Sequence, residues 1–104
     1  MVISEYIIKV LRTQIMIVLS WGFHNAKAIE DGLAFYVNGF IHQGRVEVVY
    51  DECWDLFNIR LINEDGTIKE QVEGVFVDGL VSTIDGMVEK TKDYNERVKK
   101  EYSL

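Results

Sequence analysis

Residues 33–50 read LAFYVNGFIHQGRVEVVY, and this stretch decides the fold. Residues 33–41 are rich in β-branched and aromatic side chains, which predicts a strand interrupted at Gly39. The pair Gln43-Gly44 predicts a turn, and over residues 45–50 apolar side chains alternate with mainly polar ones, as in a half-buried strand. Because the turn is short, we expect the two strands to pair in antiparallel fashion.

The pattern of short strands and short turns continues toward the C-terminus. Residues 54–62 predict a further strand. Residues 63–66, Asn-Glu-Asp-Gly, predict a hairpin turn into another strand over residues 67–72. Consecutive strands joined in this way become neighbours in one antiparallel sheet.

Upstream of these strands the sequence leaves two alternatives. Residues 2–13 carry apolar side chains at three- and four-residue spacing and predict a helix. The apolar run over residues 15–23 is rich in β-branched residues and predicts a buried strand, with residues 25–32 as the connection that follows. A helix continued to Ser20 is the alternative, although it would be hydrophobic on nearly all sides.

From Asp78 onward the apolar residues recur at helical spacing. This stripe comprises Leu80, Val81, Ile84, Met87, Val88, Thr91, Tyr94, Val98 and Tyr102. The sequence therefore predicts an α+β fold in a single domain spanning residues 1–104. Its antiparallel sheet of about four to five strands is flanked by an N-terminal and a C-terminal helix.

The composition fits one small domain and excludes several classes of protein. Of the 104 residues, 48% are hydrophobic and 12% aromatic, more than a disordered segment carries. The single cysteine, Cys53, cannot form an intrachain disulfide, which favours a reducing compartment. No apolar run approaches the ~18 residues of a membrane span, so we expect a soluble cytoplasmic protein without membrane association.

The negative charge is concentrated in the middle of the chain. The formal net charge is −6, and residues 45–89 carry eleven acids against three bases. Such a segment repels phosphate groups at long range, so nucleic acid is not an expected partner.

The two histidines, His24 and His42, are the first candidates for chemistry. If the strands over residues 15–23 and 33–41 are antiparallel neighbours, the two imidazoles lie at opposite ends of the sheet, roughly 30 Å apart at about 3.3 Å per residue. This separation disfavours a shared site. A small enzyme or ligand-binding domain that uses His24, Asp31 or His42 beside aromatic residues stays an alternative.

Other catalytic and metal-binding signals are weak. Cys53 lies between carboxylates, which raise the pKa of a thiol and oppose its use as a nucleophile. Asp51, Glu52 and Asp55 could gather around a cation, but a charged turn explains them equally well. Glycine-rich phosphate loops and nucleophile elbows are missing from the sequence. We therefore expect no metal and no cofactor, and the balance is against an enzyme.

The strongest functional signal is an excess of apolar side chains on both faces of the predicted strands. Either the helices cover opposite faces of the sheet, or another chain covers one face. The leading hypothesis is a non-catalytic protein–protein interaction module that acts as a homodimer, or that binds another protein. The candidate interface residues are aromatic, because such residues carry much of the energy of protein contacts: Trp21, Phe23, Tyr36, Phe40 and Trp54.

An acidic inhibitor is the remaining alternative. Carboxylates on strands and turns could mimic nucleic acid and occupy the basic groove of a partner. The acidic surface candidates are Asp51, Glu52, Asp55, Glu64 and Asp65. This hypothesis requires that these side chains align on one surface.

Overall fold

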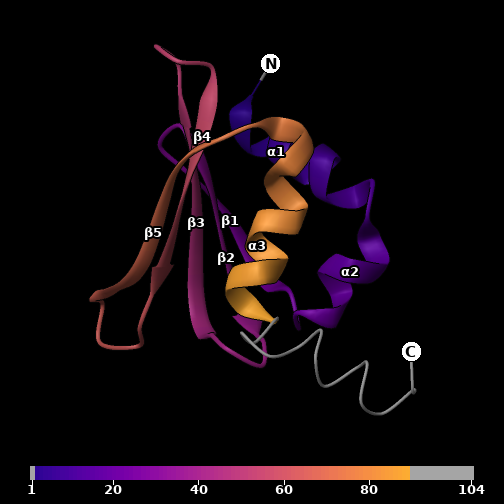
Figure 1. Ribbon diagram of the computed structural model, residues 1–104, viewed down its shortest axis with the longest axis vertical. Helices are drawn as coiled ribbons and strands as arrows, with labels where there is room; N and C mark the ends of the chain where they lie inside the picture. Colours follow the sequence, from indigo (N-terminus) through magenta and orange to yellow (C-terminus); the bar gives the residue numbers. More distant parts are fainter. Residues whose placement is uncertain (1, 90–104) are drawn as a thin grey trace, which may run out of the picture.

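The computed structural model describes residues 2–89 as a layer of helices packed against one antiparallel sheet (Figure 1). The strands are neighbours in chain order, β1-β2-β3-β4-β5, and each pair is antiparallel. The elements are α1 (Ile3–Arg12), α2 (Ile15–Ser20), β1 (His24–Ile29), β2 (Gly32–Asn38), β3 (Gln43–Asp51), β4 (Leu56–Ile62), β5 (Ile68–Val75), a 3₁₀ turn η1 (Val77–Gly79) and α3 (Leu80–Val88). The predicted α+β fold is confirmed.

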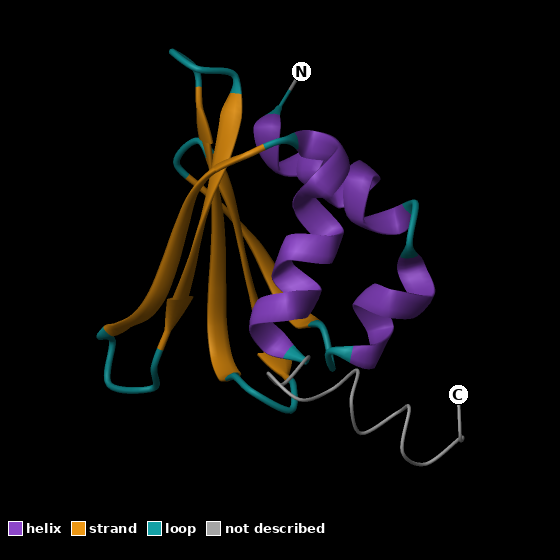
Figure 2. Ribbon diagram, in the orientation of Figure 1, coloured by secondary structure: helices purple, strands orange, loops and turns teal. Residues whose placement is uncertain are grey.

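The core lies between the helices and one face of the sheet, as Figure 2 shows. Alternate residues of β2, β3 and β4 are buried on this face, which is the period of two that the sequence shows. The helices contribute apolar residues at helical spacing. The buried apolar residues of the helices and the following turn are Ile7, Leu11, Val18, Trp21, Leu80, Val81, Ile84, Met87 and Val88.

The predicted strand over residues 15–23 is wrong. This segment forms α2 and a turn, and the first strand is β1, which occupies the predicted connection. Val18 is the one buried residue of α2, so most of the β-branched side chains in this run are exposed on a helix and do not belong to a buried strand. The polar, mostly exposed β1 is held by its pairing with β2 and carries no alternating apolar pattern. The alternative of a helix to Ser20 is correct, with a break between α1 and α2 at Thr13 and Gln14.

The C-terminal helix begins two residues later than Asp78, which lies in η1. The apolar stripe over Leu80–Val88 faces the core as predicted. The continuation of that stripe through Thr91, Tyr94, Val98 and Tyr102 lies outside the described residues. Among residues 2–89, no helix has the length and apolar character of a membrane span.

Both edge strands are irregular. The register between β1 and β2 shifts between His24 and Lys27, and β5 has two shifts against β4. Such irregularities twist a strand and interrupt its row of free backbone groups. Pairing of another chain at either edge is therefore disfavoured, although the chain has no proline to protect its edges.

No helix within residues 2–89 covers the second face of the sheet, because α1, α2 and α3 all lie on the same side (Figure 1). We call the uncovered side the open face. The alternative in which the helices cover opposite faces of the sheet is therefore wrong. The open face is mixed: β2 contributes Ala34 and Tyr36, whereas the central residues of β3 and β4 are Arg45, Glu47 and Arg60.

Candidate functional site

Strand register arranges the open face in two rows of side chains that cross all five strands. Each row takes one residue from every strand in turn. The first row is His24, Tyr36, Arg45, Ile62 and Ile68, and the second row is Lys27, Ala34, Glu47, Arg60 and Gln71. Each row thereby joins side chains from one edge strand to the other, from residue 24 to residue 68 in the first row and from residue 27 to residue 71 in the second.

A carboxylate flanked by two guanidinium groups occupies the centre of the open face. Arg45 Nε donates a hydrogen bond of 2.9 Å to Glu47 Oε2, and Arg45 Nη2 lies 2.8 Å from the same oxygen. Arg60 Nε lies 3.5 Å from Glu47 Oε1. Burial alone would lower the pKa of Arg45, but hydrogen bonds to the Tyr36 hydroxyl and to Glu47 raise it above its ordinary value. The two arginines therefore share one carboxylate.

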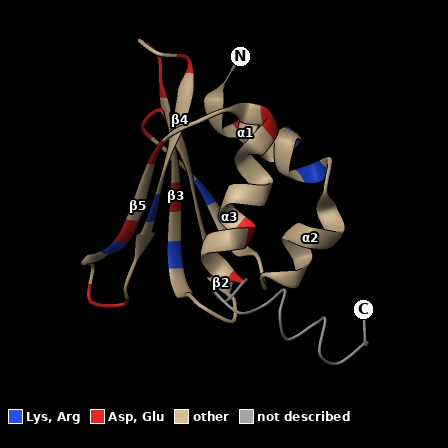
Figure 3. Ribbon diagram, viewed as in Figure 1, with Lys and Arg blue, Asp and Glu red and all other residues tan. Residues whose placement is uncertain are grey.

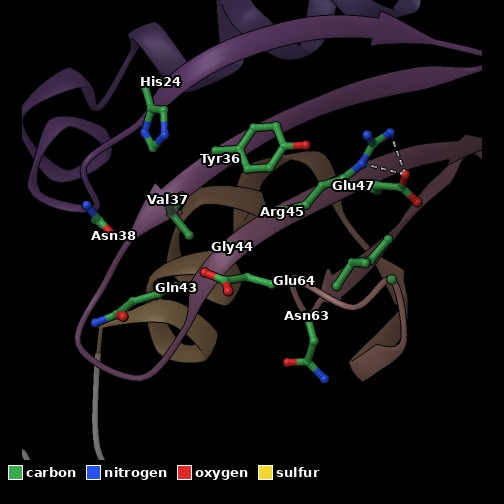
Figure 4. Close-up of a pocket in the computed structure, with 12 residues that line it drawn as sticks. His24, Tyr36, Val37, Asn38, Gln43, Gly44, Arg45, Glu47, Asn63 and Glu64 are labelled. Atoms are coloured by element: carbon green, nitrogen blue, oxygen red, sulfur yellow. Dashed lines mark hydrogen bonds and ion pairs between the residues drawn. The ribbon is translucent and has the colours of Figure 1, made fainter.

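A hollow of about 560 Å³ adjoins this cluster, at the end of the sheet where β2 meets β3. Figure 4 shows Tyr36 and His24 on one side of the hollow and the β4–β5 turn with Asn63 on the other. The polar side chains that line it are His24, Tyr36, Asn38, Gln43, Arg45, Glu47, Asn63 and Glu64. Amide groups and charges of both signs thus outnumber the apolar residues of its wall.

The two histidines lie at the same end of the sheet, so the predicted separation to opposite ends is wrong. That expectation rested on a strand over residues 15–23. His24 pairs with Tyr36 at the start of β1 and lies at the hollow, with Nδ1 2.6 Å from the carbonyl of Gly22. His42 is buried beside Gly44, with Nε2 3.1 Å from the carbonyl oxygen of Arg45. Asp31 lies in the β1–β2 turn at the far end of β1, away from both imidazoles.

His42 predicts a dependence of stability on pH. Burial, the largest effect, lowers its pKa below 6.5. The hydrogen bond to the carbonyl of Arg45 and the negative charge of Glu70 raise the pKa, whereas the positive charge of Lys69 lowers it further. The unfolded chain then binds a proton more readily than the folded protein, so the free energy of unfolding falls as the pH drops below about 6.5. Urea unfolding at about pH 7.5 and pH 5.5 measures this loss. His42→Gln is expected to reduce it, and His24→Gln, at an exposed position, to retain it. An unchanged pH dependence in His42→Gln would contradict the assignment.

The acidic candidates divide between two hairpins. Asp51, Glu52 and Asp55 lie at the β3–β4 turn, while Glu64 and Asp65 lie at the β4–β5 turn, at the other end of β4 (Figure 3). They do not form one surface, which removes the basis of the nucleic-acid mimic. Within residues 2–89, no group of three or more potential metal-ligating side chains occurs. Cys53 is exposed, and its backbone N–H donates to Asp51 Oδ1 at 3.0 Å.

The aromatic candidates also lie in different places. Trp21 belongs to the core, where it stacks on Phe35 and its Nε1 donates to Asp85 Oδ1 at 2.9 Å. Phe23 is half-buried against the same core. Tyr36 lies on the open face. Phe40, in the β2–β3 loop, and Trp54, in the β3–β4 turn, are exposed at opposite ends of the sheet.

The sequence analysis missed the main exposed apolar surface, which is on α2. Four of its six side chains are large, apolar and exposed: Ile15 (44%), Met16 (78%), Ile17 (38%) and Leu19 (57%). We call these four residues the α2 patch. The sequence did contain a signal for this surface, because the alternative prediction was a helix to Ser20 that is hydrophobic on nearly all sides. A helix of that kind in a small fold exposes part of its apolar surface.

Comparisons with protein-family models, with curated proteins and with solved structures found no significant match.

Proposed function

We propose that this protein is a non-catalytic protein–protein interaction module that acts as a homodimer through the α2 patch. The proposal rests on one observation: four large apolar side chains are exposed on a short helix that has no charged residue. Contiguous exposed apolar surface of this kind marks protein contacts. A closed two-fold dimer buries the same patch of both copies.

Charge favours a second copy on α2 and disfavours one on the open face. Two α2 patches meet without any like-charge contact, since each is uncharged. Two open faces would bring the Arg45 and Arg60 guanidinium groups of both copies together. The α2 patch is thus the surface that is complementary to itself.

The neighbouring helix α1 supplies the additional area that a stable dimer needs. A six-residue helix is only about 9 Å long, whereas a standard interface buries about 800 Å² per partner. A groove of about 400 Å³ follows α1 and includes Glu5, Tyr6, Ile8 and Lys9. In an antiparallel pair of helices, Glu5 of one copy faces the basic end of α1 of the other.

The free, exposed thiol of Cys53 supports a reducing compartment as the place of action. We therefore propose that the dimer forms in the cytoplasm.

Light scattering and sedimentation equilibrium test the dimer. The wild-type chain of 12.0 kDa is expected to show twice that mass at tens of micromolar. Met16→Glu places a charge in the patch and is expected to weaken the dimer at least about tenfold, because an unpaired charge is costly to desolvate. Met16 is 78% exposed, so the monomer should stay folded by circular dichroism.

Trp54→Glu is the matched control, since Trp54 is a similarly exposed large side chain outside the patch. It should leave the mass unchanged. A wild-type monomer at every concentration, or a dimer that Met16→Glu leaves intact, would overturn the proposal.

A further inference from the structure

The two central rows of the open face carry an excess of positive charge in a protein of net charge −6. The two rows of the open face contain Lys27, Arg45 and Arg60 but only one acid, Glu47. Glu47 is already engaged by Arg45 through two contacts shorter than 3.0 Å. The two central rows therefore carry an excess of positive charge, while Glu64 at the hollow and Glu73 beside Gln71 add negative charge at their margins.

Arg60 has donor capacity that the described residues do not use. Its Nε is buried, yet within residues 2–89 it has no hydrogen-bond acceptor, and the nearest carboxylate oxygen is at 3.5 Å. A guanidinium group presents several N–H donors in a planar fork that matches the two oxygens of a carboxylate. Nε itself is out of reach of a ligand, but the side chain is 35% exposed and its terminal nitrogens are not among the buried atoms, so an incoming carboxylate can pair with them without displacing Glu47 from Arg45.

The hollow beside the arginines is lined by groups that pair with peptide bonds. Asn38, Gln43 and Asn63 line it, and a side-chain amide can both donate and accept hydrogen bonds, although Asn63 Nδ2 already donates to Thr67 Oγ1 at 3.1 Å. Figure 4 shows Asn38 and Gln43 at one margin of the hollow and Asn63 at another, with Glu64 between Gln43 and the Arg45–Glu47 pair. A ligand that crosses the hollow thus meets amides at its margins and the Glu64 carboxylate between them.

We propose that the open face binds an extended peptide segment of a partner protein that carries charges of both signs. An Asp or Glu of the segment contacts Arg60 and Arg45, its backbone contacts the amides of the hollow, and an uncharged or basic residue lies at Glu64. A single-stranded nucleic acid fits less well, because it carries a phosphate at every nucleotide and would place phosphates against Glu64. Among the described residues, the centre of the face offers it the ring of Tyr36 for stacking, with the imidazole of His24 beside that ring at 5.9 Å, and no longer series of aromatic rings.

This inference does not depend on dimerisation through the α2 patch, because the open face lies on the opposite side of the sheet from α2 (Figure 1). The Met16→Glu variant is expected to bind the same peptides as the wild-type protein. Failure of the dimer proposal therefore leaves the peptide site testable, and failure of the peptide site leaves the dimer testable.

The test uses a random octapeptide display library and the immobilised full-length protein. Selected peptides are synthesised with a fluorophore, and their affinity is measured by fluorescence anisotropy. We expect selected sequences to contain Asp or Glu together with Lys or Arg. Arg60→Gln is expected to weaken binding at least about tenfold, as does replacement of the acidic residue of the peptide by its amide.

Lys69→Gln is the control for net charge, since it removes one positive charge from the edge strand β5, outside the hollow. Lys69 Nζ donates to the carbonyl of Ile41 at 2.8 Å and does not line the hollow, so the substitution should change affinity by less than about twofold in moderate salt, which screens charges that do not contact the ligand. The proposal is overturned if no peptide is selected, or if the selected peptides bind Arg60→Gln as tightly as wild type. Tighter binding of an eight-nucleotide oligouridylate than of any peptide would also overturn it and assign the face to nucleic acid.

Discussion

Trp21→Ala is expected to lower the free energy of unfolding by about 3–5 kcal/mol, the usual cost of truncating a fully buried aromatic side chain. Trp21 is 0% exposed, and its ring stacks on Phe35 at 6.5 Å between centroids. Its Nε1 donates to Asp85 of α3, and its carbonyl accepts from the backbone N–H of Asn38 at the end of β2. The residue thus joins α2, α3 and the sheet, so its loss leaves a cavity where three elements meet.

The second tryptophan provides the control for this substitution. Trp54 is 75% exposed in the β3–β4 turn, and Trp54→Ala is expected to change stability by no more than about 0.5 kcal/mol. Urea unfolding, followed by circular dichroism so that neither tryptophan is needed as a probe, measures both variants. Equal losses of stability in the two variants would contradict the placement of Trp21 in the core.

Trp21→Phe separates the packing of the ring from its hydrogen bond. Phenylalanine keeps an aromatic ring against Phe35 but cannot donate to Asp85. We expect an intermediate loss, with a part of about 1.5–3 kcal/mol from the lost hydrogen bond to the carboxylate. A loss as large as that of Trp21→Ala would show that the hydrogen bond, rather than packing, carries most of the stability.

The hairpins could be predicted from the sequence because their information is local. Between residues 33 and 62, apolar side chains recur every second position and short polar turns separate the runs, so strand type and pairing follow directly. The segment 15–29 could not be predicted in this way. The apolar run of α2 resembles a buried strand, and β1 has no alternation, because its position depends on hydrogen bonds to β2 rather than on burial.

The candidate sites could be predicted less well than the fold, because they depend on contacts across the sheet. Arg45, Glu47 and Arg60 become one cluster only through the register that places Glu47 opposite Arg60. His24 reaches the hollow only because β1 begins at that residue. The aromatic candidates were chosen by residue type, and residue type alone does not distinguish the buried Trp21 from the exposed Trp54.

Gly39→Ala is expected to destabilise the protein by about 2–3 kcal/mol, the upper part of the range for overpacking. A Cβ at this position would overlap Cγ1 of Val88 and lie 2.5 Å from the carbonyl oxygen of Val88. That oxygen accepts hydrogen bonds from the backbone N–H groups of Ile41, at 2.7 Å, and His42, at 3.3 Å. The methyl group must therefore push the end of α3 away from the β2–β3 loop and break the bonds that hold them together.

Gly86→Ala is the matched control, and its expected effect has the opposite sign. Gly86 lies inside α3, is exposed, and would place a Cβ with no atom within 4 Å. Alanine at such a helical position is expected to stabilise the protein by up to about 1 kcal/mol, because it restricts the unfolded chain. Thermal unfolding of both variants and of the wild type should thus place Gly39→Ala below the wild type and Gly86→Ala above it. If Gly39→Ala unfolds at the wild-type temperature, the close contact between the β2–β3 loop and the end of α3 is not present in the protein.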